Sequence, residues 1–154
     1  MEKNHPTLAY NLGIFLELKT GVVPIALVQK RWPKTLLPEV FRWIEENIQG
    51  GEVSQSSFKF SFSGNHLENI FGEIFTQGST VRYYGKLPEA KSVNSIVRIY
   101  PDRVDIRVNQ GQVLERTKLL KGQLQFYDLD TDHEKFACRF STSGPLEEAL
   151  TVID

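Results

Sequence analysis

The run VNSIVRIYPDRVDIRVNQGQVLERTKLLK, residues 93–121, decides the fold class of this chain. Apolar and polar residues alternate through most of it, and the turn dipeptides Pro101-Asp102 and Gln110-Gly111 interrupt the alternation at hairpin spacing. In residues 103–109 the apolar side chains share one face and the charged ones share the other. The run therefore predicts three antiparallel strands with one face open to water, over residues 93–100, 103–109 and 113–120.

Strands are predicted on both sides of this run as well. The segment SFKFSFS, residues 57–63, places its three phenylalanines on one face and Lys59 and Ser61 on the other. Residues 81–86, 124–127 and 135–141 add three more strands. In the last of these, Cys138 alternates with two phenylalanines and is expected on the core face.

Helical spacing predominates before residue 53. Residues 8–16 place their leucines and Phe15 on one stripe, and residues 35–48 carry a second apolar stripe. Residues 22–32 fit either a strand or a short buried helix. In residues 65–77, apolar side chains recur at i, i+3, i+4, i+7 and i+8 behind a capping-box-like pair, which predicts a helix inserted among the strands.

The chain of 154 residues is expected to form one α+β domain over residues 1–154. Its helical part spans residues 1–52, its mostly β part spans 53–143 with the inserted helix, and a short tail spans 144–154. The strands are expected to form a twisted antiparallel sheet. A partly closed β-barrel with helices is the alternative architecture.

Composition limits the possible functions. The net charge of −1 excludes binding of nucleic acid or anionic membrane by bulk charge alone. The single cysteine allows no internal disulfide and suits a reducing compartment, so a cytoplasmic location is expected. No apolar run reaches the length of a membrane-spanning helix, and no membrane partner is expected.

Sequence motifs point to no metal, cofactor or catalytic residue. Asp128, Asp130 and Asp132 have the spacing of a calcium loop, but His133 replaces its glycine and Arg139 replaces its terminal acid. The three histidines are scattered, and neither a nucleophile elbow nor a phosphate-binding loop is present. The carboxylates are therefore interpreted as a solvated loop.

Charge is segregated along the chain. Residues 78–127 hold nine Lys and Arg against four Asp and Glu, whereas residues 128–154 hold two against seven. Strand alternation predicts an outward basic face, and its candidate binding residues for nucleic acid or a partner are Arg82, Tyr84, Lys86, Arg103, Arg107, Arg116 and Lys118. Cations mixed with rings on a sheet suit single-stranded nucleic acid. An acidic protein partner and an ordinary solvated face are the alternatives.

A second candidate surface lies in the helical part. Arg31, Trp32 and Trp43 are candidate partner-binding residues, because Trp and Arg are enriched in binding hot spots. The alternative is that both tryptophans cover the core.

Residues 93–121 also resemble the strand run of small accessory subunits in type III CRISPR effector complexes. The resemblance covers under a fifth of the chain and carries over no functional residue. It implies an α+β, non-catalytic protein seated on a ribonucleoprotein.

The leading hypothesis is therefore a non-catalytic binding protein, a subunit of a larger protein or ribonucleoprotein assembly such as an RNA-guided antiviral defence complex. Its expected partners are other protein subunits and single-stranded RNA. A small-ligand carrier with a cavity lined by Phe58, Phe60 and Phe62 is the second hypothesis. An enzyme with dispersed catalytic residues is the third.

Overall fold

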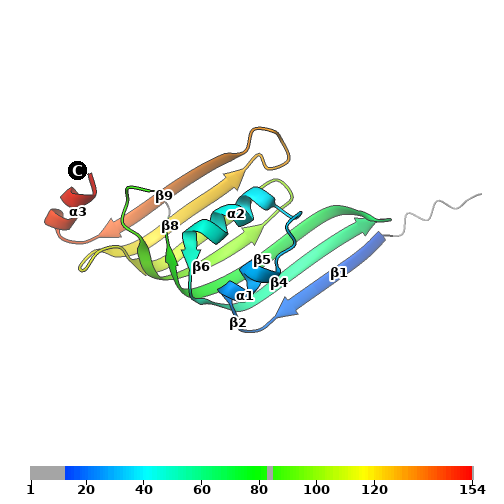
Figure 1. The fold of residues 1–154 in the computed structure, drawn as a ribbon, viewed down its shortest axis with the longest axis horizontal. Helices are drawn as coiled ribbons and strands as arrows, with labels where there is room; N and C mark the ends of the chain where they lie inside the picture. The colour runs from blue at the N-terminus through cyan, green and yellow to red at the C-terminus, as the bar shows by residue number, and fades with distance from the viewer. Residues whose placement is uncertain (1–12, 83–84, 154) are drawn as a thin grey trace, which may run out of the picture.

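The computed structural model describes residues 13–82 and 85–153, and a large antiparallel sheet dominates them (Figure 1). Its main strands are β1 Gly13–Thr20, β4 Glu52–Ser63, β5 His66–Val81, β6 Ala90–Ile99, β7 Val104–Gln112, β8 Lys118–Tyr127 and β9 Lys135–Ser143, which neighbour one another in that order. The short strands β2 Val23–Pro24 and β3 Ile48–Gln49 pair with β4 and β5. The helices are α1 Ile25–Arg31, α2 Pro38–Asn47 and α3 Leu146–Ile153.

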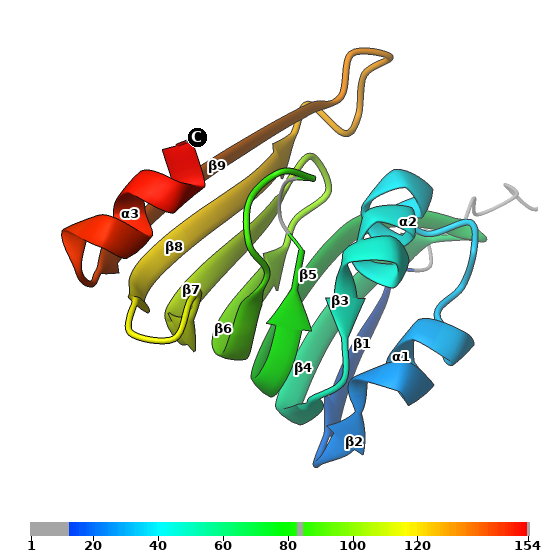
Figure 2. The ribbon, with the colours of Figure 1, turned by 60° about the vertical axis from the view of Figure 1, so that its left-hand side comes forward.

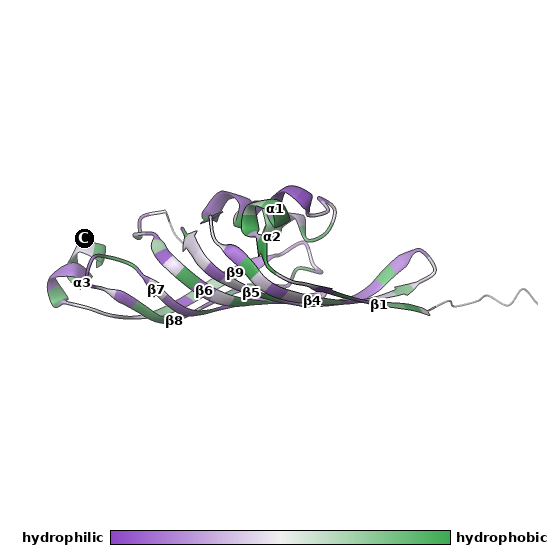
Figure 3. Cartoon of the chain, turned by 90° about the horizontal axis from the view of Figure 1, so that it is seen from below, coloured by the Kyte–Doolittle hydropathy of each residue, from purple (hydrophilic) through white to green (hydrophobic). Residues whose placement is uncertain are grey.

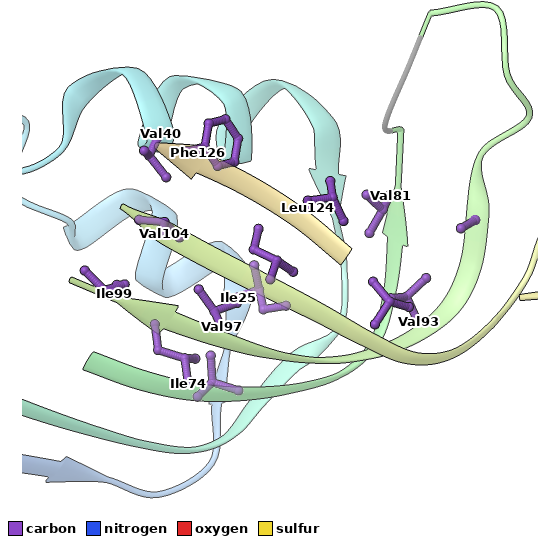
Figure 4. Close-up of a cluster of buried hydrophobic side chains, with 14 of the residues drawn as sticks. Ile25, Val40, Ile74, Val81, Val93, Val97, Ile99, Val104, Leu124 and Phe126 are labelled. Atoms are coloured by element: carbon purple, nitrogen blue, oxygen red, sulfur yellow. The ribbon is translucent and has the colours of Figure 1, made fainter. Parts of the chain in front are cut away.

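Helices α1 and α2 lie against one face of the sheet, which we call the covered face (Figures 2 and 3). The opposite face carries no helix of the described residues, and we call it the open face. Buried apolar side chains from α1, α2 and the middle strands meet between the two layers, as Figure 4 shows for Ile25, Val40 and Val97. The core therefore lies on one side of the sheet only.

Strand register aligns the apolar residues of the covered face. Ile74 lies opposite Val97, Val97 lies opposite Ile106, and Ile106 lies opposite Leu124. All four side chains are buried. Because directly opposite residues share a face, this row fixes the direction of the neighbouring side chains on the four strands as far as the next register shift.

The helix predicted over residues 65–77 is wrong, because this segment is strand β5. It pairs along its length with β4 on one side and β6 on the other. Residues four positions apart share a face in a strand as well as in a helix, so the apolar spacing fitted both periods. In the strand, Ile70 and Ile74 face the core, while Phe71 lies half-buried on the open face against Tyr100.

The helix predicted over residues 8–16 is also corrected. Residues from Gly13 onward form the edge strand β1, and Leu8 and Leu12 lie outside the described residues. The ambiguous segment 22–32 contains both β2 and α1. The helix predicted within residues 35–48 is confirmed as α2, which begins after Leu37 in a left-handed backbone conformation with φ of 50°.

The sheet is open and not a barrel, because β1 and β9 are its two edges and do not pair with each other. This arrangement changes the burial expected for the last strand. Cys138 lies opposite Leu124 and thus on the covered face, as its alternation predicted. It is exposed nevertheless, because it stands on the edge strand.

Two leucines of β8 test this layering. Leu124 is 1% exposed and Leu120 is 52% exposed. We expect Leu124→Ala to lower the free energy of unfolding by about 2–5 kcal/mol, because it leaves a cavity in the core. Leu120→Ala is expected to stay within about 0.5 kcal/mol of the parent. Urea unfolding of both variants measures the difference, and equal losses would contradict the one-sided core.

Candidate nucleic-acid interface

A row of side chains crosses the open face from β5 to β9. The register places Phe75 opposite Ile96, Ile96 opposite Arg107, Arg107 opposite Gln123, and Gln123 opposite Arg139. Each pair shares a face, so all five residues lie on the open side of the sheet. The row thus runs from an aromatic ring to two guanidinium groups.

A hollow of about 450 Å³ lies at the basic end of this row. Arg107, Lys121 and Arg139 contribute its cations, and we call these three residues the basic cluster. Asn109, Gln123 and Ser141 add polar groups, and no Asp or Glu lines the hollow. The arrangement offers positive charge together with uncharged hydrogen-bonding groups, as an anion requires.

The basic cluster is not neutralised within residues 13–82 and 85–153. All three residues are exposed, and none of them forms an ion pair with a described carboxylate. Three cations of one sign in one hollow raise the local positive potential and attract anions. The net charge of −1 for the whole chain conceals this local excess.

Other arginines on the open face do have carboxylate partners. Arg98 Nε donates to Glu73 Oε2 at 2.9 Å, and this hydrogen bond is the main reason why the pKa of Arg98 is raised. Arg103 Nε lies 3.4 Å from Asp105 Oδ2. In the part of the chain that the structure describes, the basic cluster lacks such a partner, which distinguishes it from Arg98 and Arg103.

Aromatic rings also lie on the open face. The rings of Phe71 and Tyr100 meet edge to face with centroids 5.4 Å apart, and the Arg103 guanidinium carbon lies 3.8 Å from the Tyr100 centroid. Phe75 is half-buried in the same row as Arg107. Rings with an accessible face can stack on unpaired bases.

The structure disperses the basic residues that the sequence grouped together. Arg107 lies in the hollow, and Arg103 lies on the same face but is paired. The others stand near the opposite end of the strands: Arg82 and Lys86 between β5 and β6, Arg116 between β7 and β8, and Lys118 at the start of β8. Tyr84 lies outside the described residues.

Sequence reasoning did not select Lys121 and Arg139. Lys121 shares the open face with Gln123 by plain alternation, but the register shifts between Leu119 and Lys121, so alternation counted from Lys118 places Lys121 on the wrong face. Arg139 was available from the alternation of its own strand. The acidic residues before it give that segment a negative net charge, which conceals this cation in a charge count.

Arg116 has a structural role at the start of α3. Glu148 accepts hydrogen bonds from the Arg116 backbone N–H at 3.1 Å and from Thr117 Oγ1 at 2.6 Å. Arg116 Nε lies 3.4 Å from the same carboxylate. The Thr117 hydroxyl is the main reason why the pKa of Glu148 is lowered.

The two tryptophans pack inside the helical cover. Trp32 stacks on Phe41 with centroids 3.8 Å apart, and its Nε1 donates to the Leu36 carbonyl at 2.8 Å. Trp43 lies edge-on to Phe126 at 5.3 Å. Both side chains are half-buried and pack against the core, while Arg31 beside them is exposed.

An apolar cavity of about 70 Å³ lies between the helices and the covered face. Phe41, Trp43 and Val97 are among its lining residues. Phe58, Phe60 and Phe62 do not line it, so the cavity expected from these three phenylalanines is placed wrongly. They stack along β4 instead.

Within residues 13–82 and 85–153, no group of three His, Cys, Asp or Glu side chains is placed to hold a metal ion. None of the helices in the same part of the chain has the length and hydropathy needed to cross a membrane.

The anchor of α3 gives a test in pH. Because the pKa of Glu148 is lowered in the folded chain, its contribution to stability is present at neutral pH and is lost as the pH falls through that lowered pKa. NMR titration is expected to place the Glu148 pKa below its ordinary value of 4.5. Thr117→Val removes the main cause and should raise it. An unshifted pKa in the parent protein would contradict the anchor.

No family model, no curated protein and no solved structure matches this chain.

Proposed function

We propose that the protein is a non-catalytic binding subunit of a ribonucleoprotein assembly, and that it contacts single-stranded RNA through the open face of its sheet. The observation that carries this proposal is the basic cluster, three cations in one hollow that have no carboxylate partner among residues 13–82 and 85–153. A place in an RNA-guided defence complex belongs to the same proposal and rests on the resemblance of residues 93–121.

Phosphate groups fit the basic cluster for a physical reason. A guanidinium offers several N–H donors in a planar fork that matches phosphate oxygens, and Lys121 adds a compact charge. The amide and hydroxyl groups of Asn109, Gln123 and Ser141 line the same hollow and can donate to further oxygens. Such contacts supply affinity without reading sequence.

Rings beside the cations favour a single strand over a duplex. Phe75 lies two strands from Arg107 in the same row, a separation of roughly 10 Å. A strand whose phosphates occupy the hollow can therefore place a base toward this ring. In a duplex the bases are paired and stacked internally, and only the backbone would reach the sheet.

Neutralising the basic cluster tests the phosphate contacts. We expect Arg107→Gln, Lys121→Gln and Arg139→Gln together to weaken binding of an oligouridine and to reduce the salt dependence of binding. The slope of log K against log salt should fall by about 0.7 for each lost phosphate contact, so by about two for the triple variant. Fluorescence anisotropy at several salt concentrations measures both quantities.

A matched control removes the same charge from the helical side. Lys30, Lys34 and Arg42 are exposed on or beside α1 and α2. Their triple replacement by Gln should leave affinity and salt slope within error of the parent protein. Equal losses in the two triple variants would show an effect of net charge alone and would contradict the proposed face.

Phe75→Leu tests stacking separately from charge. Leucine keeps most of the apolar volume but removes the aromatic face, so oligouridine affinity should fall by about 1 kcal/mol with an unchanged salt slope. Phe136→Leu on the covered face is the control and should leave RNA binding unaltered. Unchanged affinity in Phe75→Leu would remove the stacking part of the proposal.

A small-ligand carrier is the second candidate, and the cavity under the helices favours it. This cavity is almost wholly apolar, so its occupant would be a small apolar molecule. Its volume of about 70 Å³ is below the ~150 Å³ of a cavity that admits benzene. A larger ligand would have to move α1 or α2 away from the sheet.

A further inference from the structure

Exposed apolar side chains concentrate in one short segment of the described chain. Five of its eleven exposed large apolar residues fall between positions 14 and 22: Ile14, Phe15, Leu16, Leu18 and Val22. Phe15 is 83% exposed, and the three aliphatic residues of β1 are 43–46% exposed. Ile14, Leu16 and Leu18 share the covered face, opposite Phe62, Phe60 and Phe58, and an exposed apolar row of this kind marks an interaction site.

The backbone of this segment has one edge that no described strand uses. Strand β1 pairs with β4 over its whole length, from Gly13 opposite Ser63 to Thr20 opposite Ser56. No strand of the described residues pairs with its other side. The N–H and C=O groups that point away from β4 therefore form a template for one more strand.

We propose that β1 pairs antiparallel with β1 of a second copy of this chain, around a twofold axis at Leu16. In this register Leu16 lies opposite the partner's Leu16, and Ile14 lies opposite the partner's Leu18. Every apolar residue on the covered face of β1 then gains an apolar neighbour. Gly13 lies opposite the partner's Lys19, so β1 is paired with the partner strand over nearly its full length.

Other self-pairings of β1 are less favourable. A register centred on Glu17 sets two like charges opposite each other, which destabilises a cross-strand pair. A register centred on Leu18 keeps Ile14 and Phe15 outside the strand-to-strand overlap. A shift by a single residue would turn the apolar side chains of one copy toward the open face.

The twofold pairing also closes the assembly. Both copies use the same edge, so the dimer leaves no β1 edge free and no third copy can add there. Pairing of β1 with β9 of another copy would instead leave one free edge at each end and continue into a filament. The axis stands perpendicular to the sheet, so the open faces of both copies lie on the same side. This inference does not depend on RNA binding.

Mass measurement of the full chain is the first test. Sedimentation at micromolar concentrations should give a dimer of twice the 17.6 kDa chain mass. Leu16→Lys places two like charges at the axis and should give a folded monomer with an unchanged circular dichroism spectrum. Leu27→Lys, at an equally exposed site on α1, should stay dimeric. A monomeric parent, an open-ended polymer, or a dimeric Leu16→Lys would each overturn the proposal.

Cross-linking tests the register without relying on a destabilising variant. In a Cys138→Ser background, Leu16→Cys should form an intermolecular disulfide under mild oxidation, because the two Cα atoms at the axis lie about 4.5–5.5 Å apart. Leu18→Cys should not, since each copy's residue faces the partner's Ile14. A disulfide in Leu18→Cys but not in Leu16→Cys would overturn the register proposed here. RNA binding plays no part in either readout.

Discussion

The structure depends on one mismatch of size, between a wide apolar sheet face and a narrow helical cover. Seven strands at about 4.8 Å spacing span roughly 29 Å. Helices α1 and α2 hold seven and ten residues, and each helix is about 10 Å across. They bury the middle strands and leave both edges of the covered face uncovered.

This mismatch explains where the unusual surfaces lie. Ile74, Val97 and Leu124 stand under the helices and form the core. Leu16 on β1 and Cys138 on β9 occupy the same face at the edges and are exposed. An exposed edge strand with apolar side chains is a liability that natural proteins usually cover. A second copy at β1 would cover it.

The open face follows from the same layering. Because no described helix covers it, its side chains contact solvent and are accessible to ligands, and they are not packed against a second layer. Two of its arginines are paired with carboxylates, Arg98 with Glu73 and Arg103 with Asp105. The basic cluster departs from that pattern, and this departure is the basis for placing a polyanion there.

Sequence patterning predicted strands at β4, β6, β7 and β9, but it also placed residues 113–117 in a strand, whereas they connect β7 to β8. The inward positions of β7 and the helix α2 follow directly from apolar spacing. Strand β5 was predicted as a helix because residues four positions apart share one face in a strand as well as in a helix. Gly72 is the residue in this segment that disfavours a helix interior. In the strand, a Cβ at this position would come within 2.9 Å of the Phe58 ring.

The candidate site was predictable only in part. Arg107 follows from alternation, but alternation counted from Lys118 misplaces Lys121, because the sequence does not reveal the register shift that lies between them. The sequence also does not show which arginines form an ion pair with a carboxylate, because a partner can lie on another strand or helix. Arg116 looks like a surface cation in the sequence, and only the fold brings Glu148 of α3 beside it.

Chemical-shift mapping of the protein during titration with oligouridine tests the central claim most directly. The account predicts perturbations at the open-face residues Phe75, Ile96, Arg107, Lys121 and Arg139, with residues around the apolar cavity, such as Val40 and Trp43, unchanged. Perturbations confined to the cavity, or none at all at saturating oligouridine, would contradict an RNA-binding open face.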